Sequence, residues 1–155
     1  MNDRSIVRDI VTGDIDMDAL QDRILKVFMA EISTEVMRGT PVDKGYMRQH
    51  WHEETAGRHQ LILSNNTAYL PFHITGTGLY GPKHQMICAK GMSKQNPKYP
   101  HVMAWRSRGK TGMVFRRCTK GIRPNSFIET GIEAGITNAI DVLTNLFEGA
   151  DHVVG

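Results

Sequence analysis

The sequence predicts an α+β fold: a small, mostly antiparallel sheet, an N-terminal and a C-terminal helix packed on one face of it, and a long basic loop. Two observations predict it. Apolar residues recur at steps of three and four near both ends of the 155-residue chain, as in amphipathic helices. Between these ends the pattern changes to short alternating runs separated by Gly and Pro, which indicates strands and turns. We expect one domain, with residues 1–14 as a lead-in and residues 149–155 as a tail.

The first expected helix spans residues 15–38. Asp14 or Asp16 can cap it, because a carboxylate there accepts hydrogen bonds from unpaired backbone N–H groups. Its predicted apolar face consists of Met17, Leu20, Ile24, Val27, Phe28, Ile32 and Val36. A basic residue, a glycine and then Pro41 predict where the helix ends.

A β-hairpin is expected over residues 46–64, after the turn at residues 40–45. Its first strand would place Met47, Gln49 and Trp51 on one face. The chain from 65 to 111 is rich in Gly and Pro and is predicted to be a long irregular loop, with one short strand near 85–90. Such a loop is usually functional, or mobile until a partner orders it.

The last strand is expected over residues 112–119 and the last helix over residues 126–148, capped by Asn125 or Ser126. The apolar stripe of this helix consists of Ile128, Ile132, Ile136, Ala139, Ile140, Leu143, Leu146 and Phe147. Gly131 and Gly135 each cost roughly 1 kcal/mol in a helix interior. They lie four residues apart on one face, so we expect them to let another backbone approach closely.

Charge is strongly segregated along the chain. Residues 55–128 contain no Asp or Glu but hold twelve of the 19 Lys and Arg, whereas the flanks carry all 16 acids and a net charge of −9. The candidate subunit, partner or DNA-backbone contacts are Lys83, Lys90, Lys94, Lys98, Arg106, Arg108, Lys110, Arg116 and Arg117. The partner can be a nucleic acid, with the basic 83–123 region as a non-specific binder, or the acidic part of a neighbouring copy.

Other function classes have weaker signals. No apolar run approaches the ~18 residues of a membrane helix, and the N-terminus has no signal-peptide pattern. His50, His52 and His59 are candidate metal ligands on the hairpin, but surface side chains are the favoured interpretation. No catalytic arrangement stands out, so we expect no enzyme and no cofactor.

Two further motifs favour plain interpretations. The glycines of residues 76–81 match a dinucleotide-binding pattern, but no strand precedes them and Pro82 follows, so we expect a loop tip. Cys88 and Cys118 are too sparse for a disulfide framework, so we expect two reduced thiols.

Three segments together resemble the HK97 gp10-like family of phage tail-completion, or head–tail joining, proteins. Residues 40–51 (TPVDKGYMRQHW) are similar to the family's T-P-V-D-T-G-x-L-R-x-S-W after an N-terminal helix. Residues 63–69 and then the G-T-G of residues 76–78 are similar to its strand ending in S-N, with a Tyr four residues later and a G-T-G turn. Residues 123–128 (RPNSFI) look like its R-P-x-x-F-L entry to the last helix. The motif residues are Pro41, Asp43, Gly45, Trp51, Asn65, Tyr69, Gly76, Gly78, Arg123, Pro124 and Phe127.

The resemblance implies a structural virion protein at the head–tail junction, assembled in the host cytoplasm. It implies a homo-oligomeric ring, expected to be a hexamer, through which genomic DNA passes. It also implies contacts with the connector or adaptor and with tail-tube or tail-terminator proteins, and none with a membrane. Because ring interfaces are heterologous, the basic loop and the acidic flanks offer a matching pair.

Overall fold

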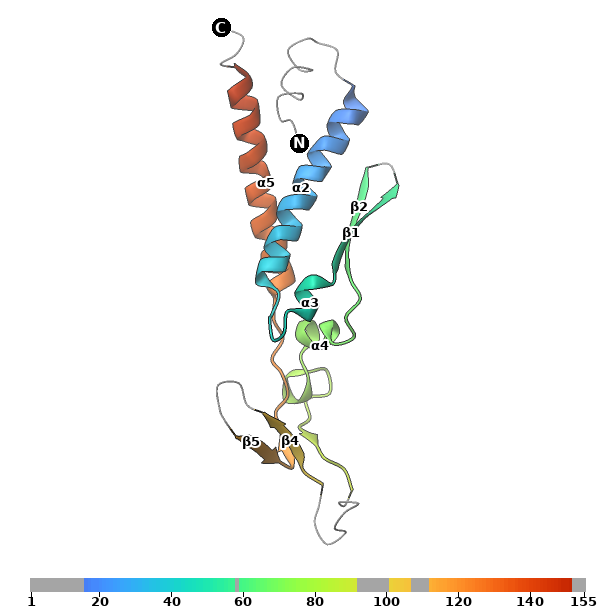
Figure 1. The fold of residues 1–155 in the computed structure, drawn as a ribbon, viewed down its shortest axis with the longest axis vertical. Helices are drawn as coiled ribbons and strands as arrows, with labels where there is room; N and C mark the ends of the chain where they lie inside the picture. The colour runs from blue at the N-terminus through green and yellow to red at the C-terminus, as the bar shows by residue number, and fades with distance from the viewer. Residues whose placement is uncertain (1–15, 58, 92–100, 107–111, 152–155) are drawn as a thin grey trace. The chain divides into compact units, whose positions relative to one another are not determined.

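The computed structural model describes residues 16–57, 59–91, 101–106 and 112–151 (Figure 1). The elements are α2 (Met17–Gly39), α3 (Tyr46–Gln49), β1 (Trp51–Gly57), β2 (Gln60–Asn65), α4 (Leu70–Thr75), η1 (Gly78–Tyr80), β3 (Ile87–Cys88), β4 (Met103–Arg106), β5 (Met113–Arg116), β6 (Cys118–Thr119) and α5 (Phe127–Asp151). The α+β prediction is confirmed: two long terminal helices pack together and accompany small antiparallel sheets. Among the described residues the strands form three separate two-stranded sheets instead of one.

The chain divides into two compact units, which the prediction of one domain does not anticipate. The helical unit comprises Met1–Thr67 and Ser126–Gly155, and the central unit comprises Ala68–Asn125. Every one of the 16 acids lies in the helical unit, whereas the central unit carries 11 of the 19 Lys and Arg. The charge boundary read from the sequence therefore coincides closely with a structural boundary.

Helix α2 begins and ends close to its predicted limits. Asp16 is its N-cap, and the carboxylate accepts hydrogen bonds from the backbone N–H groups of Asp18 and Ala19 at 3.0 and 3.2 Å. At the other end the Arg38 carbonyl accepts a hydrogen bond from Arg48 Nη2 at 3.1 Å. Both contacts satisfy terminal backbone groups that have no partner inside the helix.

The expected strand start at residue 46 is wrong, because residues 46–49 form the short helix α3. Gly45 adopts φ 81°, and its carbonyl accepts a hydrogen bond from the Gln49 N–H at 3.1 Å. This single turn buries Met47, whose side chain is 2% exposed. Burial of that side chain favours the turn over an extended backbone.

The hairpin is formed by β1 and β2, paired antiparallel from Trp51↔Asn65 to Gly57↔Gln60 with an irregularity near Thr55. On β2, Leu61 and Leu63 are half-buried and the intervening Ile62 is exposed, as the period of a strand requires. Helix α2 contacts this hairpin on one side and α5 on another (Figure 1).

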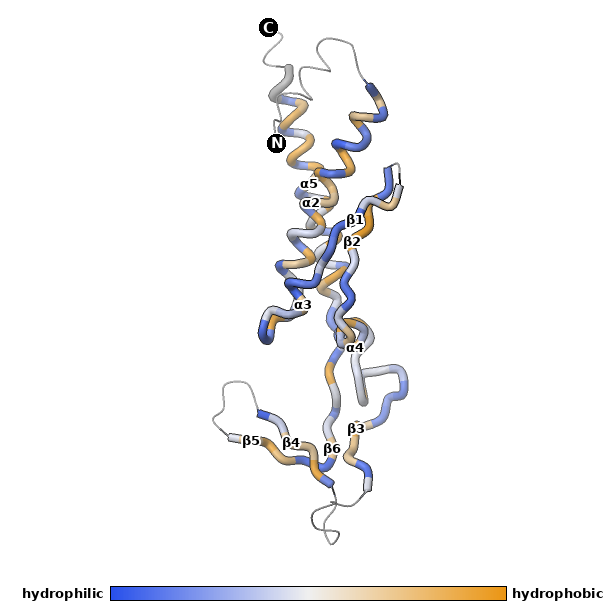
Figure 2. The backbone as a smooth tube through the Cα atoms, turned by 45° about the vertical axis from the view of Figure 1, so that its right-hand side comes forward, coloured by the Kyte–Doolittle hydropathy of each residue, from blue (hydrophilic) through white to orange (hydrophobic). Residues whose placement is uncertain are grey.

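The crossing of α2 and α5 is made by small residues, as predicted. A Cβ added to Gly135 would lie 2.4 Å from Ile32 Cα, and one added to Gly131 would lie 2.8 Å from Val36 Cα. Ala139 continues the same face and is completely buried. From this crossing the two helices diverge toward their far ends (Figures 1 and 2). None of the helices in the described ranges is both long and apolar enough to cross a membrane.

The described part of residues 65–111 is more ordered than the irregular loop that the Gly and Pro content predicted. The short strand expected near 85–90 is present as β3, and α4, η1 and β4 were not expected. Pro71 lies in the first turn of α4, where its missing N–H is tolerated. The predicted strand over residues 112–119 is also broken: β5 pairs with β4, and β6 pairs with β3.

The G-T-G glycines are not a loop tip. They cross the segment at residues 120–122, with Thr77 N–H donating to the Ile122 carbonyl at 2.9 Å and Leu79 N–H to the Lys120 carbonyl at 2.8 Å. Gly78 has φ 65°, and an added Cβ would lie 2.4 Å from the Lys120 carbonyl oxygen. Only glycine fits this close backbone crossing.

The expectation of two reduced thiols is wrong in this structure. Cys88 on β3 and Cys118 on β6 are cross-strand partners and form a disulfide over a sequence separation of 30 residues. The spacing along the chain carried no signal, because the pairing depends on two strands that are brought together from distant positions.

Candidate assembly surfaces

The turn motif at residues 40–51 is held by buried hydrogen bonds. Trp51 Nε1–H donates to Thr40 Oγ1 at 2.9 Å, and this hydroxyl donates to the Val36 carbonyl at 2.7 Å. Both side chains are buried, whereas Asp43 is exposed and Pro41 is half-buried. The motif thereby joins the end of α2 to the start of β1.

Asn65, from the second motif, also uses its side chain internally. Its amide Nδ2 donates to the Met47 carbonyl at 2.8 Å, and its Oδ1 accepts from the Thr67 backbone N–H and hydroxyl at 3.1 and 2.8 Å. These bonds fix the end of β2 against α3. Tyr69, four residues after Asn65, lies in the central unit and is exposed.

The third motif divides between the two units. In the central unit the Arg123 guanidinium lies over the Tyr80 ring, 5.1 Å from its centroid. The hydrogen bond from Arg123 to the phenol lowers the pKa of Tyr80. Desolvation is the second-largest effect and opposes this shift, and the charges of Arg123 and Lys120 lower the pKa further. Pro124 packs against Gly76, where an added Cβ would lie 2.9 Å from the proline Cδ. Phe127, in the helical unit, is buried beside Gly39 at the start of α5.

Part of the apolar stripe that the sequence predicted for the last helix, α5, is exposed. The seam of Gly131, Gly135 and Ala139 is buried, but the adjoining side chains are not. The open α5 face consists of Ile132, Ile136, Ile140 and Phe147, which are 38%, 39%, 51% and 40% exposed. The sequence carried a signal for this exposure, because the apolar stripe of the helix is wider than the seam of small residues that packs against α2.

Acidic residues border the open α5 face. Glu129 and Glu133 precede Ile132 and Ile136 by three residues, so they lie on the same side of the helix, and both are exposed. The whole of α5 contains five acids and no Lys or Arg. This surface is therefore apolar with a negative margin.

A second open surface lies on the ribbon formed by β4 and β5. The register pairs Ala104 with Phe115 and Arg106 with Met113, and these four side chains share one face and are all exposed. Phe115 is 63% exposed and Met113 is 50% exposed. We call these four residues the ribbon face.

The opposite side of the ribbon is better covered. It carries Met103 and Val114, which are half-buried, together with Trp105 and Arg116. Of the predicted basic contacts, the described ones are all exposed: Lys83, Lys90, Arg106, Arg116 and Arg117. Lys94, Lys98, Arg108 and Lys110 lie outside the described residues.

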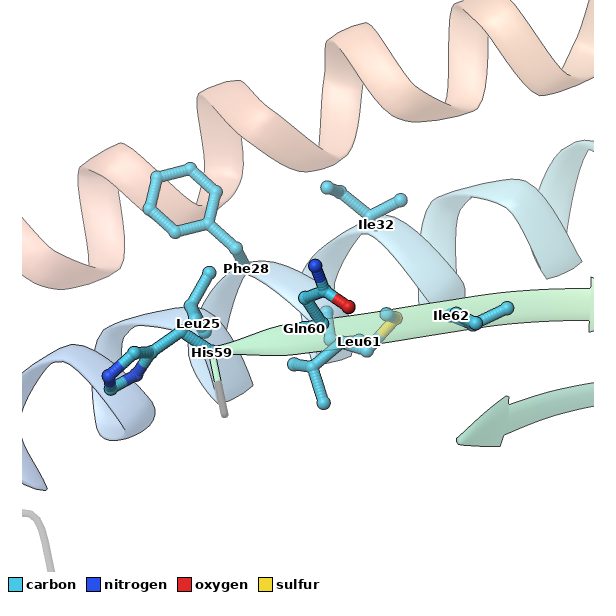
Figure 3. A pocket seen from close by; sticks show the side chains of 8 residues that line it. Leu25, Phe28, Ile32, His59, Gln60, Leu61 and Ile62 are labelled. Carbon is cyan, nitrogen blue, oxygen red and sulfur yellow. The ribbon is translucent and has the colours of Figure 1, made fainter. Parts of the chain in front are cut away.

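An open groove of about 400 Å³ lies between α2 and β2 (Figure 3). Its apolar lining includes Leu25, Phe28, Ile32 and Leu61, and His59 lies at one end (Figure 3). The lining is mainly apolar, and His59 and Gln60 are its polar residues, so the groove is suited to apolar contact.

The three candidate metal-binding histidines make other contacts. His59 Nδ1 lies 2.9 Å from Asp22 Oδ1 on α2. His50 stacks on Tyr46 at 3.8 Å between ring centroids, and its Nδ1 lies 2.7 Å from the Tyr46 carbonyl oxygen. The His52 ring lies edge-on to that of His50, 6.4 Å away between centroids. Among the described residues no group of three or more His, Cys, Asp or Glu is arranged to hold a metal ion.

Comparison of the chain with protein-family models, with curated proteins and with solved structures found no match. The resemblance to the tail-completion family therefore rests on the three motifs themselves.

Proposed function

We propose that the chain is a non-enzymatic structural subunit of a tailed-phage particle, a tail-completion or neck protein that forms a homo-oligomeric ring at the head–tail interface. The observation that carries the proposal is the open α5 face. A row of large side chains left open beside a helix–helix seam is typical of a surface that another subunit covers. The three sequence motifs suggest which kind of assembly this is.

The local chemistry of the motifs supports a building block. Trp51, Thr40 and Asn65 use their polar atoms to join helix to strand. The motif glycines allow a close backbone crossing in the central unit. These residues therefore act on the shape and rigidity of the subunit, as a ring component requires, rather than converging on a substrate.

In the proposed ring, six copies meet through heterologous interfaces and genomic DNA passes through the lumen. The ring binds the connector or adaptor on one side and tail-tube or tail-terminator proteins on the other. Exposed basic residues of the central unit such as Lys83 and Lys90 are suited to the phosphate backbone, without reading sequence. The ring is assembled in the host cytoplasm and retained in the virion.

A second candidate function, non-specific nucleic-acid binding by the free protein, is favoured by the composition of the central unit. It has no acid, and the exposed aromatic side chains Trp105 and Phe115 lie among its arginines. Bases stack on such side chains while the cations neutralise phosphate. Binding of this kind weakens steeply as salt is raised.

Light scattering of the purified protein across concentration tests the first proposal, with Ile140→Glu as the disruptive variant. We expect the wild type to form a closed oligomer and the variant to stay smaller, because a carboxylate in a buried apolar interface is strongly disfavoured. Ile62→Glu is the matched control: Ile62 is exposed to a similar extent but lies on β2.

Two results would speak against the proposal. If the wild type stays monomeric at every concentration and binds DNA in a salt-sensitive way, the nucleic-acid function is favoured instead. If the oligomer dissociates with Ile62→Glu and not with Ile140→Glu, the α5 face is not the surface that assembles it.

A further inference from the structure

We infer that the ribbon face of one copy docks on the open α5 face of a second copy. The inference rests on the proposed assembly function and specifies which surfaces meet. It begins from the chemistry of the two surfaces. The first is apolar, and all the charged residues of its helix are acidic; the second is apolar and includes one arginine.

The α5 side offers isoleucines at helical spacing. Ile132, Ile136 and Ile140 follow one another at steps of four, with Glu129 and Glu133 beside them. No lysine or arginine anywhere in α5 neutralises these acids. A partner that covers the isoleucines therefore gains most if it also brings positive charge.

The ribbon offers the complementary set. Phe115 and Met113 provide the apolar contact, Ala104 allows close approach, and Arg106 provides the charge. The central unit contains no Asp or Glu, so no carboxylate within it competes for Arg106. The arginine can approach Glu133 or Glu129 of a second copy with a planar, bidentate geometry.

The dimensions of the two surfaces also agree. A strand of four residues, the length of β4 and of β5, extends over about 10 Å. Ile132 and Ile140 are eight residues apart, which is about 12 Å along a helix axis. One ribbon face can therefore cover the central part of the isoleucine row.

The observations favour a protein partner over nucleic acid for the ribbon face. A base can stack on Phe115, but it offers little to Met113, and it leaves the α5 isoleucines uncovered. A second copy covers both surfaces in one interface. Because the two surfaces differ, every copy carries one surface of each kind and can bind a neighbour through each. Such heterologous association adds one copy after another until the ring closes.

Charge reversal provides the test, with mass measured by analytical ultracentrifugation across concentration at moderate salt. Arg106→Glu places a second carboxylate against Glu133, and Glu133→Arg places a second guanidinium against Arg106. We expect each variant alone to associate about tenfold more weakly or worse, because like charges meet in the interface. Both positions are exposed, so circular dichroism should show that the variants stay folded.

Two rescue arms give the distinctive result. The double variant Arg106→Glu/Glu133→Arg should associate within about threefold of the wild type, a difference below about 1 kcal/mol. An equimolar mixture of the two single variants should recover part of the association, because the original Arg106 of one variant meets the original Glu133 of the other. Lys44→Glu, the same kind of charge reversal at an exposed residue outside the ribbon and the basic 83–123 region, is the control and should leave the mass unchanged.

The remaining outcomes separate the inference from the function. If the wild type is an oligomer and neither charge reversal changes its mass, the inference is overturned but the ring proposal is not. Loss of association without rescue in the double variant also overturns the inference. If Arg106→Glu weakens binding of a DNA oligonucleotide and leaves the mass unchanged, the ribbon face is a nucleic-acid surface. A wild-type monomer at all concentrations overturns both proposals.

Discussion

Replacing Gly135 by alanine should destabilise the protein, although alanine is the better helix former. Gly135 lies where α5 crosses α2, and it is buried. An added methyl group would lie 2.4 Å from Ile32 Cα and 2.7 Å from its backbone nitrogen. Ordinary contacts of this kind are 3.4 Å or longer. The two helices must therefore separate by about 1 Å at the crossing to admit the methyl group, a shift that forfeits a quarter to a half of the dispersion energy of each stretched contact.

The magnitude follows from two opposing terms. Exchanging glycine for alanine in a helix interior gains about 1 kcal/mol. Overpacking a closed interface costs roughly 1–3 kcal/mol, and here the obstacle is backbone, which cannot rotate away as a side chain can. Separation of the helices also loosens Val36 against Gly131 one turn away. The difference between the two terms is about 0–2 kcal/mol. Because the obstacle is backbone, we expect the upper half of that range, a net loss of about 1–2 kcal/mol, which lowers Tm by roughly 2–8 °C for a chain of this length.

The assay is thermal unfolding followed by far-ultraviolet circular dichroism at one fixed protein concentration, because association would shift Tm with concentration. Gly39→Ala is the matched control. It makes the same change at the end of α2, where the added methyl group would meet Phe127 at 3.4–3.5 Å, an ordinary contact. We expect it to be neutral or slightly stabilising. If Gly135→Ala behaves like Gly39→Ala, the close crossing of the two helices does not exist.

Two further predictions concern the central unit. Replacing Cys88 and Cys118 by serine should destabilise this unit by roughly 3–4 kcal/mol, which is the loss of loop entropy that the disulfide imposes on the unfolded chain at a separation of 30 residues. The circular dichroism of the helices should change little. An equal loss of stability in both units would contradict this prediction. Arg123→Gln should raise the pKa of Tyr80 toward its ordinary value. The titration is followed by the absorbance of the phenolate, after subtraction of the spectrum of the Tyr80→Phe variant. A titration that does not change would refute the contact between Arg123 and Tyr80. Because folding lowers this pKa, the contribution of Tyr80 to stability should grow as pH rises between its folded and unfolded pKa, and the variant should lose that rise.

The helices could be predicted because their signals are local. The apolar period, the Asp16 cap and the Gly39–Pro41 stop all lie within a few residues of the feature that they determine. The same holds for Gly131 and Gly135, whose spacing alone indicated a close backbone approach. Their partners at that crossing are Ile32 and Val36, on the predicted apolar face of α2 about a hundred residues away. Nothing local in the sequence indicated that these residues meet the two glycines.

The sheet was harder to predict because strands depend on partners. Residues 46–49 alternate like a strand, yet burial of Met47 and the left-handed Gly45 make them a helical turn. The segment at 112–119 reads as one strand but divides between two partners. The disulfide depends on the same pairing. Contacts distant in sequence thus decided each feature that local pattern missed.

The boundary between the two units explains what the segregation of charge along the chain can do. A basic stretch between acidic flanks can be a solvated loop whose charges are neutralised by neighbouring elements of the same fold. Here the stretch largely coincides with a compact unit that contains no acid, so its arginines have no carboxylate within their own unit to meet. The helical unit is the reverse, with 16 acids against eight basic residues. Positive and negative surfaces carried on separate units of one chain favour association between copies, because each copy brings the complement of its neighbour.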